Sequence, residues 1–351
     1  MERYIGMDVH SQTCTLAVVD QKGRQIRKDV VETNGKVLVE YLRLIPGRKH
    51  LCLEEGTQSQ WLSEILSPHV QDLAVIWPEK KPGNKNDELD ALSLAEQMRA
   101  GNLAKKVFKA PESFTALRQL ARCYEMVTGD VARTKNRIRG LFRSRGVSTE
   151  EIGAVRQAGC ETAEKQLKQG ARQVVEMLFK ELEGQEAVKK GVQALLLAEA
   201  RKHSAMKLLE TVPGFGPVRA AQLLSVVVTP DRFRTLRQFW SYCGLGIVMR
   251  SSSDWVQAPN GGWDRSPVKK VRGLNRNFSR TAKNLMKGAA TTVICQMHDN
   301  PLNADYRRLL EGGTKPNLAK LTIARKIAGA ARAVWRNKEE YNPDRGRKGT
   351  K

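Results

Sequence analysis

Apolar residues in the first hundred positions alternate between short β-type runs and stretches with helical spacing. Short connections separate the first three runs, which is typical of antiparallel hairpins. Helical spacing follows from Val37 to Ile45 and ends at Pro46 and Gly47, which stop a helix. The pattern predicts three strands, a helix, a strand, a helix, a strand and a helix, with the strands at residues 3–9, 13–19, 25–31, 50–54 and 72–77.

This order of elements is that of a ribonuclease-H-like fold, which belongs to the α/β class. In that fold the first and fourth strands are neighbours, and their ends lie near the last helix. Asp8 ends the first strand, Glu54 ends the fourth, and Asp87 and Asp90 begin the helix. Residues three apart share one face of a helix, so Asp87 and Asp90 are expected to point the same way. The order of elements therefore predicts that four carboxylates converge.

A carboxylate cluster of this kind suits divalent ions that activate a nucleophile and stabilise a leaving oxygen at a phosphate. Oxygen ligands and phosphate chemistry favour Mg²⁺, with Mn²⁺ as the alternative. Each acid also has a simpler explanation, because acids in a first turn favour the helix dipole and Glu54 with Glu55 is compatible with a solvated pair. The coincidence of all four acids at these elements favours the metal site.

Helical spacing with a basic face begins beyond Pro111. Apolar residues recur with helical period from Leu117 to Phe142, within a segment of roughly 30 residues or about 45 Å of continuous helix. A solvated face is the usual explanation of such charge. Here the charge is one-sided, which favours contact with phosphates, and the basic residues include Arg133, Arg137, Arg139 and Arg143.

Residues 160–210 continue as a charged helical segment whose periodicity is interrupted near Glu183 and Gly184. We expect helical hairpin or coiled-coil packing, within one chain or between chains. The run from Val212 to Gly216 (Val-Pro-Gly-Phe-Gly) then resembles a helix-hairpin-helix. Gly214 and Gly216 allow a tight turn, and the following helix offers backbone amides to a phosphate. A plain helix–helix turn needs the same residues, so both interpretations stand equal.

Three serines, Ser251 to Ser253, follow an apolar run and an arginine. By itself this pattern favours a polar loop over a nucleophile. A dense basic stretch comes next, and its residues include Lys269, Lys270, Arg272, Arg276 and Arg280. An alanine-rich helix is predicted from Asn317 to Trp335, and residues 343–351 form a basic tail expected to be disordered.

The charge balance indicates what these elements bind. The 351 residues include 60 Lys and Arg against 37 Asp and Glu, a net charge of +23 spread along the chain. A polyanionic partner is the simplest cause, because cationic side chains release counterions when they bind nucleic acid. The six cysteines lack the spacing of a zinc site, and no signal peptide or membrane-spanning run is evident. We expect a soluble cytoplasmic protein with reduced thiols and no membrane partner.

Several motifs carry a resemblance to a known family. They occur in the order Ile5-Gly6-Met7-Asp8-Val9-His10, Leu53-Glu54, Asn84-Lys85-Asn86-Asp87-Glu88-Leu89-Asp90-Ala91, Val212-Pro213-Gly214-Phe215-Gly216 and Cys243-Gly244-Leu245 followed by the serines. In this order and spacing the chain resembles an insertion-sequence transposase of the DEDD type, the IS110 family, which is related to the Piv DNA invertases. The resemblance runs from residue 3 to about residue 335.

The resemblance implies a RuvC-like catalytic domain over residues 1–110, a basic helical or coiled-coil region over 111–204, and a C-terminal transposase domain over 205–340, followed by a basic tail at 341–351. It implies that Asp8, Glu54, Asp87 and Asp90 bind the metal, and that Ser252 is a nucleophile that forms a covalent link to DNA. Homodimers or homotetramers, and a structured non-coding RNA that bridges donor and target DNA, are implied in the same way.

Two departures from the family pattern concern the serine. The family commonly has a glycine just after it, whereas Ser253 stands here, so Ser251 and Ser253 remain alternatives to Ser252. Residues Trp255 to Pro267 form a longer insert before a basic helix. These departures leave the register of the serine open.

The sequence as a whole predicts a Mg²⁺-dependent, RNA-guided DNA recombinase, in which base pairing supplies the choice of sequence. One alternative is a RuvC-like hydrolytic nuclease or junction resolvase, in which water attacks and the serine loop is structural. The other alternative is a non-catalytic nucleic-acid-binding protein.

Overall fold

The computed structural model of the chain describes residues 1–78, 87–103, 105–147, 167–250, 255–265 and 270–343. The chain divides into two compact units, Met1–Thr115 and Ala116–Lys351, called here the N-terminal and C-terminal units. The N-terminal unit is α/β and the C-terminal unit is mostly helical, as the sequence predicts. The predicted subdivision of the second unit near residue 204 stays a prediction.

The N-terminal unit is built on a five-stranded sheet in the order β3-β2-β1-β4-β5. β1 pairs antiparallel with β2 and parallel with β4, so the first and fourth strands are neighbours as predicted. All five predicted strands are present, as β1 (Glu2–Val9), β2 (Thr13–Val19), β3 (Gln25–Glu32), β4 (Arg48–Glu54) and β5 (Asp72–Ile76).

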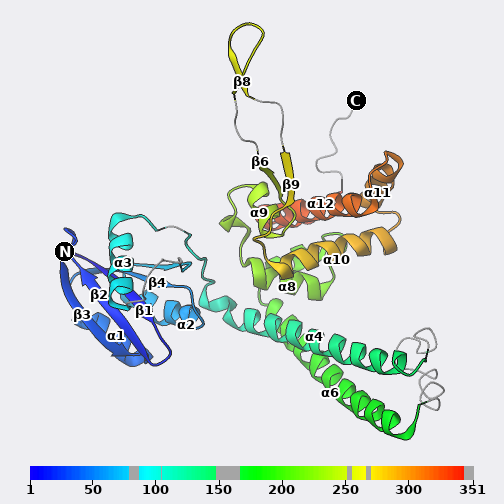
Figure 1. The fold of residues 1–351 in the computed structure, drawn as a ribbon, viewed down its shortest axis with the longest axis horizontal. Helices are drawn as coiled ribbons and strands as arrows, with labels where there is room; N and C mark the ends of the chain where they lie inside the picture. Colours follow the sequence, from blue (N-terminus) through cyan, green and yellow to red (C-terminus); the bar gives the residue numbers. More distant parts are fainter. Residues whose placement is uncertain (79–86, 104, 148–166, 251–254, 266–269, 344–351) are drawn as a thin grey trace. The chain divides into compact units, whose positions relative to one another are not determined.

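Helices cover both faces of this sheet (Figure 1). On one face, α1 (Gly35–Leu44) and α2 (Ser59–Leu66) bury Ile5 and Met7 of β1 in the larger apolar core. On the other face α3 (Asp87–Ala100) packs against residues of β4 and β5. Because side chains alternate along a strand, the even-numbered residues of β1 face α3. Two 3₁₀ turns, η1 (Ser67–His69) and η2 (Glu112–Phe114), complete the unit.

Gly6 allows α3 to lie directly on the backbone of β1. A Cβ added at this glycine would be 2.5 Å from the Ala95 amide nitrogen, 2.9 Å from Leu94 Cβ, and closer still to the Ala91 carbonyl oxygen. No side chain fits in that space. The absence of a Cβ at position 6 therefore sets how closely the first turns of α3 approach the end of β1.

Two long helices pair at the start of the C-terminal unit: α4 (Thr115–Arg143) and α6 (Gln169–Ala200). Ile138 and Phe142 of α4 share an apolar cluster with Val175 of α6, and Lys135 pairs with Glu186 at 2.9 Å. A helical pair within one chain is thus present, and coiled-coil geometry stays a prediction. α6 runs unbroken through residues 183–184, because one glycine inside a long helix costs only about 1 kcal/mol.

The rest of the C-terminal unit contains the helices α7 (Ala205–Glu210), α8 (Pro217–Val227), α9 (Leu236–Tyr242), α10 (Arg280–Gln296), α11 (Pro301–Glu311) and α12 (Pro316–Asn337), with the 3₁₀ turn η3 (Pro230–Arg232). The predicted C-terminal helix is confirmed as α12. Two small antiparallel sheets are also present: β6 (Ile247–Arg250) pairs with β9 (Lys270–Leu274), and β7 (Trp255–Gln257) pairs with β8 (Trp263–Arg265).

The predicted basic helix begins later than its charge pattern indicates. Residues 270–274 form a strand because they pair with β6, and α10 starts only at Arg280. Ser279 fixes that start, since its hydroxyl accepts a hydrogen bond from the Ala282 amide at 3.3 Å.

Candidate metal centre

Asp8 and Glu54 are brought side by side by the register of two parallel strands. Met7 pairs with Leu53, and the two acids are the next residues of β1 and β4. Met7 and Leu53 point into the core under α1 and α2, so the acids point to the face that α3 covers. Both acids are partly buried. The C-terminal ends of β1 and β4 therefore place two carboxylates on the face of the sheet that α3 covers.

Asp87 and Asp90 occupy the first turn of α3 and lie close enough to act on Asp8. Burial raises the pKa of the Asp8 carboxyl, His10 opposes that rise, and the charges of Asp87 and Asp90 add to it. Glu88 lies between them in sequence and pairs instead with Lys28 of β3 at 2.6 Å. Because residues three apart share one face of a helix, Asp87 and Asp90 both lie near Asp8, whereas Glu88 in the same turn faces Lys28. Three carboxylates that repel one another favour a cation between them.

His10 is part of this cluster and was not among the predicted site residues. Its Nε2 lies 3.2 Å from Oδ2 of Asp8 and 3.2 Å from Oδ2 of Asp87, and the imidazole is half exposed. One donor atom from each of the three residues falls within 4.8 Å of the others. The sequence signal was available, because residues two apart at a strand end share a face.

The geometry around His10 fits a divalent ion. Neighbouring ligands of an octahedral ion with bonds of 2.0–2.1 Å lie about 3 Å apart, close to the two spacings of 3.2 Å. A single N–H cannot point along both directions at once, so a hydrogen bond satisfies at most one of the two carboxylates well. The backbone of His10 is held on both sides, since its N–H donates to Thr13 O at 2.9 Å and its carbonyl accepts from Thr33 Oγ1 at 2.9 Å.

Other predicted site residues fall outside this cluster or outside the described residues. Ser252 and its neighbours Ser251 and Ser253, and the run Asn84–Asn86, lie outside the described residues. The structure therefore gives no distance between the serines and the acids. The role of Ser252 stays a prediction.

The four predicted arginines of α4 differ in their partners. Arg133 pairs with Asp130 on its own helix, and a nitrogen of Arg137 lies 3.7 Å from Glu181 of α6. Within the described part of the chain, no ion pair joins Arg139 or Arg143, and Arg143 is exposed. These last two are the arginines of the set best placed for phosphate contact.

The two predicted glycines of the turn between α7 and α8 have different surroundings. Gly214 is buried with φ of +78°, and a Cβ there would lie 2.9 Å from the carbonyl carbon of Ala289 on α10. Its carbonyl accepts a hydrogen bond from Arg219 at 2.7 Å. Gly216 is exposed at the start of α8 and nothing lies within 4 Å of an added Cβ. Close packing and a positive φ together account for Gly214, whereas Gly216 lies at an accessible helix start.

The predicted basic residues near β9 are placed in part. Lys269 lies outside the described residues, Lys270 and Arg272 belong to β9, and Arg276 and Arg280 are exposed before and at the start of α10. Contact of these residues with nucleic acid stays a prediction.

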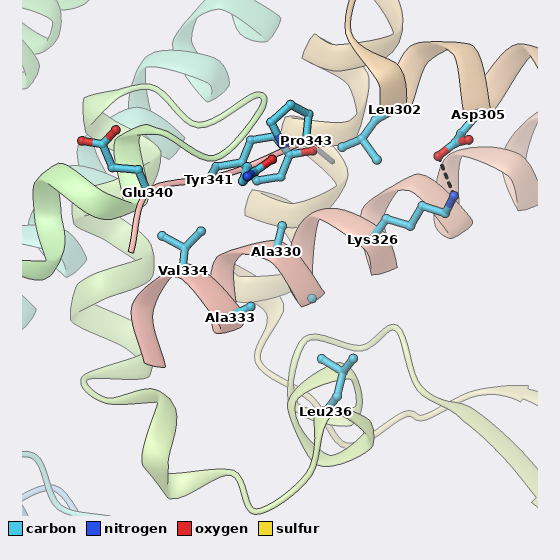
Figure 2. Close-up of a pocket in the computed structure, with 12 residues that line it drawn as sticks. Leu236, Leu302, Asp305, Lys326, Ala330, Ala333, Val334, Glu340, Tyr341 and Pro343 are labelled. Atoms are coloured by element: carbon cyan, nitrogen blue, oxygen red, sulfur yellow. Dashed lines mark hydrogen bonds and ion pairs between the residues drawn. The ribbon is translucent and has the colours of Figure 1, made fainter. Parts of the chain in front are cut away.

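Figure 2 shows a pocket of the C-terminal unit between α11, α12 and residues 340–343. Two of its charged groups are paired with each other: Asp305 accepts hydrogen bonds from Lys326 at 2.6 Å and from Arg308 at 2.7 Å. Among the described residues that line it there is no serine, cysteine or histidine. Because Asp305 is held by two cations here, whereas Asp8 lies beside further carboxylates, the candidate centre remains the acidic cluster of the N-terminal unit.

The cysteines and the helices of the described part of the chain bear on two further expectations. The five described cysteines are free thiols. Searching the described helices for a segment both long and apolar enough to cross a membrane finds none.

Comparison with known proteins identifies transposases over both units of the chain. A family model described as transposase, of the DEDD type of IS110, matches residues 5–145, and the model of the IS116/IS110/IS902 family of transposases matches residues 206–307. A transposase for insertion sequence element IS1533 from Leptospira borgpetersenii is 26% identical over 144 residues. That match covers 38% of this chain and 42% of the relative, so the chain spans less than half the length of the curated relative it matches.

Proposed function

Because the chain belongs to the IS110 family of transposases, we propose that it cuts and rejoins DNA at a divalent-metal centre formed by Asp8, Glu54, Asp87 and Asp90. The observation that carries this proposal is the meeting of Asp8 and Asp87 at His10 on the end of the sheet. Oxygen-rich donor sets of this kind favour Mg²⁺, and Mn²⁺ is the alternative.

The residues of the cluster have separate roles in this proposal. A bound divalent ion would neutralise charge on the scissile phosphate and on the oxygen that leaves it. Asp8 and Glu54 hold their positions because they end paired strands of a rigid sheet. Asp87 and Asp90 complete the ligand set from α3, which Gly6 allows to lie against β1. A centre built on packed strands and a helix keeps its ligands in place better than a loop does.

We propose a serine as the nucleophile, with Ser252 as the first candidate and Ser251 and Ser253 as its alternatives. The hydroxyl oxygen would bond to phosphorus as the strand's P–O bond breaks, and the released sugar oxygen would take up a proton. Attack by the corresponding hydroxyl of a second cut strand on the serine–phosphate link would then join the two strands and free the serine. The assignment rests on the family resemblance.

Contact with nucleic acid belongs, in this proposal, to the C-terminal unit. Residues 1–115 contain 16 Lys and Arg against 16 Asp and Glu, so the whole excess of +23 lies beyond residue 115. This partition corrects the expectation that the charge is spread along the chain. The expectations of a structured guide RNA and of homodimers or homotetramers rest on the resemblance and are proposed on that basis.

The decisive experiment compares three variants of the full chain on supercoiled donor DNA with Mg²⁺. Asp90→Asn removes one carboxylate charge from the cluster and should abolish cutting. Glu88→Gln is the matched control from the same helical turn, because its carboxylate pairs with Lys28 of β3. Ser252→Ala should prevent covalent attachment and strand transfer.

Each rival has its own outcome. If Ser252→Ala, Ser251→Ala and Ser253→Ala all release cut ends at the wild-type rate, water is the nucleophile and the protein is a hydrolytic nuclease. If Asp90→Asn leaves every activity intact, the acidic cluster is not catalytic. The guide RNA is tested separately by sequencing the nucleic acid that copurifies with the protein: one discrete structured RNA supports guidance, and random cellular RNA contradicts it.

A further inference from the structure

The strands β7 and β8 form a small hairpin with two exposed tryptophans on one face. Trp255 pairs with Arg265 and Gln257 pairs with Trp263, whereas Val256 and Asp264 form the pair between them. Because side chains alternate across a strand, Trp255 and Trp263 lie diagonally on the same face. Their exposed fractions are 56% and 64%. The hairpin therefore presents a pair of large aromatic surfaces.

The turn of this hairpin is well formed. The Ala258 amide donates to the Gly262 carbonyl at 2.7 Å, and the Gly262 amide donates to the Asn260 side chain at 3.1 Å. Gly261 has φ of +82°, which a glycine adopts without strain. These bonds fix the register that places both tryptophans on one face.

Exposure of these two side chains needs an explanation. Each Trp ring gains free energy from burial, and in the same unit Trp240 and Trp335 are half-buried. A two-stranded hairpin is at best marginally stable by itself in water. Each strand here has only three residues, and every described residue of β7 is exposed. A ligand that covers the aromatic face would stabilise both the rings and the hairpin.

The surrounding charge indicates what that ligand is. From Arg250 to Lys287 the chain has nine basic residues and two acidic ones, Asp254 and Asp264. Aromatic side chains next to concentrated positive charge are the usual means of holding unpaired nucleotides, because bases stack on the rings and cations hold the phosphates. A partner protein would need a continuous apolar patch, whereas this face also carries the polar Gln257, directly opposite Trp263 and two residues from Trp255.

The position of the hairpin in the chain fits the same ligand. Trp255 follows Ser252 by three positions, a chain length of at most about 11 Å between Cα atoms. Strand cutting at a serine and pairing with a guide RNA both leave bases without a partner near the cut. This step of the inference rests on the proposed function.

We propose that the Trp255–Trp263 face is a stacking platform for unpaired nucleobases near the scissile phosphate. The ligand is a single strand, either the DNA strand opened for cutting or a loop of the guide RNA. The shared chemistry is a base with both faces free, which a closed duplex does not offer.

The test measures binding of the full chain, in EDTA to prevent cutting, to three labelled probes: a dT oligonucleotide, an rU oligonucleotide of equal length, and a blunt duplex. Trp255→Ala and Trp263→Ala should each weaken single-strand binding roughly 5- to 150-fold, the range expected for loss of one stacked base. Duplex binding should change less than twofold. Trp255→Phe should recover much of the affinity because it keeps a stacking ring.

Val256→Ala is the matched control, because Val256 is on the opposite face of the same hairpin and is 49% exposed. It should bind all three probes as the wild type does. Loss confined to the rU probe would identify the guide RNA as the ligand, and loss confined to dT would identify the opened DNA strand.

Two results would overturn the proposal. The first is wild-type binding by both Trp→Ala variants, and the second is an equal loss for the duplex or for Val256→Ala. The proposed function fails independently, because Asp90→Asn should bind these probes normally even though it does not cut. If the Asp90→Asn protein binds the single-stranded probes as the wild type does and still cuts DNA, the metal centre is contradicted and the proposed stacking platform is not.

Discussion

Replacing Gly6 with alanine tests the contact that positions the candidate centre. The new methyl group would be 2.5 Å from the Ala95 amide nitrogen, whereas an ordinary contact begins near 3.4 Å. Backbone atoms of α3 cannot rotate away as a side chain does. The helix must therefore move by about 1 Å relative to β1, and it carries Asp87 and Asp90 with it.

The size of the effect follows from that displacement. Overpacking of a core by one methyl group costs about 1–3 kcal/mol, which in a unit of this size lowers the midpoint of thermal unfolding by roughly 4–20 °C. A metal site tolerates errors of only about 0.2 Å in its ligand positions. We therefore expect Mn²⁺ affinity to fall by roughly 10- to 100-fold, as it does when supporting contacts of metal ligands are removed.

Calorimetric titration with Mn²⁺ and a thermal melt measure the two effects on the same preparation. Gly56→Ala is the matched control in the same unit, because nothing lies within 4 Å of a Cβ at that exposed glycine. It should melt and bind Mn²⁺ as the wild type does. A Gly6→Ala variant with wild-type melting and wild-type Mn²⁺ affinity would refute the close packing of α3 on β1.

Three further predictions concern the C-terminal unit. Gly214→Ala should destabilise the fold by about 1–3 kcal/mol in denaturant unfolding, because the methyl group overpacks α10. Gly216→Ala has room for its methyl group and should leave folding unchanged, so equal losses would contradict the packing described. Asn303→Ala should lower the free energy of unfolding by about 1–3 kcal/mol, because the buried side-chain amide donates to two carbonyls of α10 at 2.9 and 3.0 Å. Wild-type stability would show that water replaces these two hydrogen bonds. Arg139→Gln and Arg143→Gln should each reduce the slope of log affinity for duplex DNA against log salt by about 1, and an unchanged slope would exclude phosphate contact there.

Much of the N-terminal unit could be predicted because its signals are local. Short runs of β-forming residues in β1 and β2, and buried runs followed by the acids Asp8 and Glu54, can be recognised from consecutive positions. The order of the elements along the chain then restricts which strands can be neighbours in the sheet, and this is why the pairing of β1 with β4 was predictable.

The contributions of Gly6 and His10 could not be predicted as easily. Gly6 matters because of a helix that begins 81 positions later in the chain, and no local pattern records that contact. His10 lies just past the end of β1, where alternation places it beside Asp8 but says nothing about Asp87. Such distant contacts decide which polar residues join a site.

The four short strands of the C-terminal unit were missed for a different reason. Lysine and arginine in β9 and a three-residue length in β7 and β8 hide the alternation that identifies a strand. Pairing with a partner strand overrides weak local preference in such segments. The tryptophans of the hairpin were visible in the sequence, and only the register showed that they share a face.

The partition of charge between the units gives the acidic cluster its physical setting. An N-terminal unit with equal numbers of acidic and basic residues has no long-range attraction for DNA, and the cluster itself repels phosphate. In the proposed function, cations at the carboxylates reverse that local repulsion, and the basic C-terminal unit attracts DNA through counterion release. The first effect depends on the concentration of divalent metal and the second on total salt. The proposed function therefore predicts that DNA binding weakens with total salt at a fixed metal concentration, and that cutting requires both bound DNA and divalent metal.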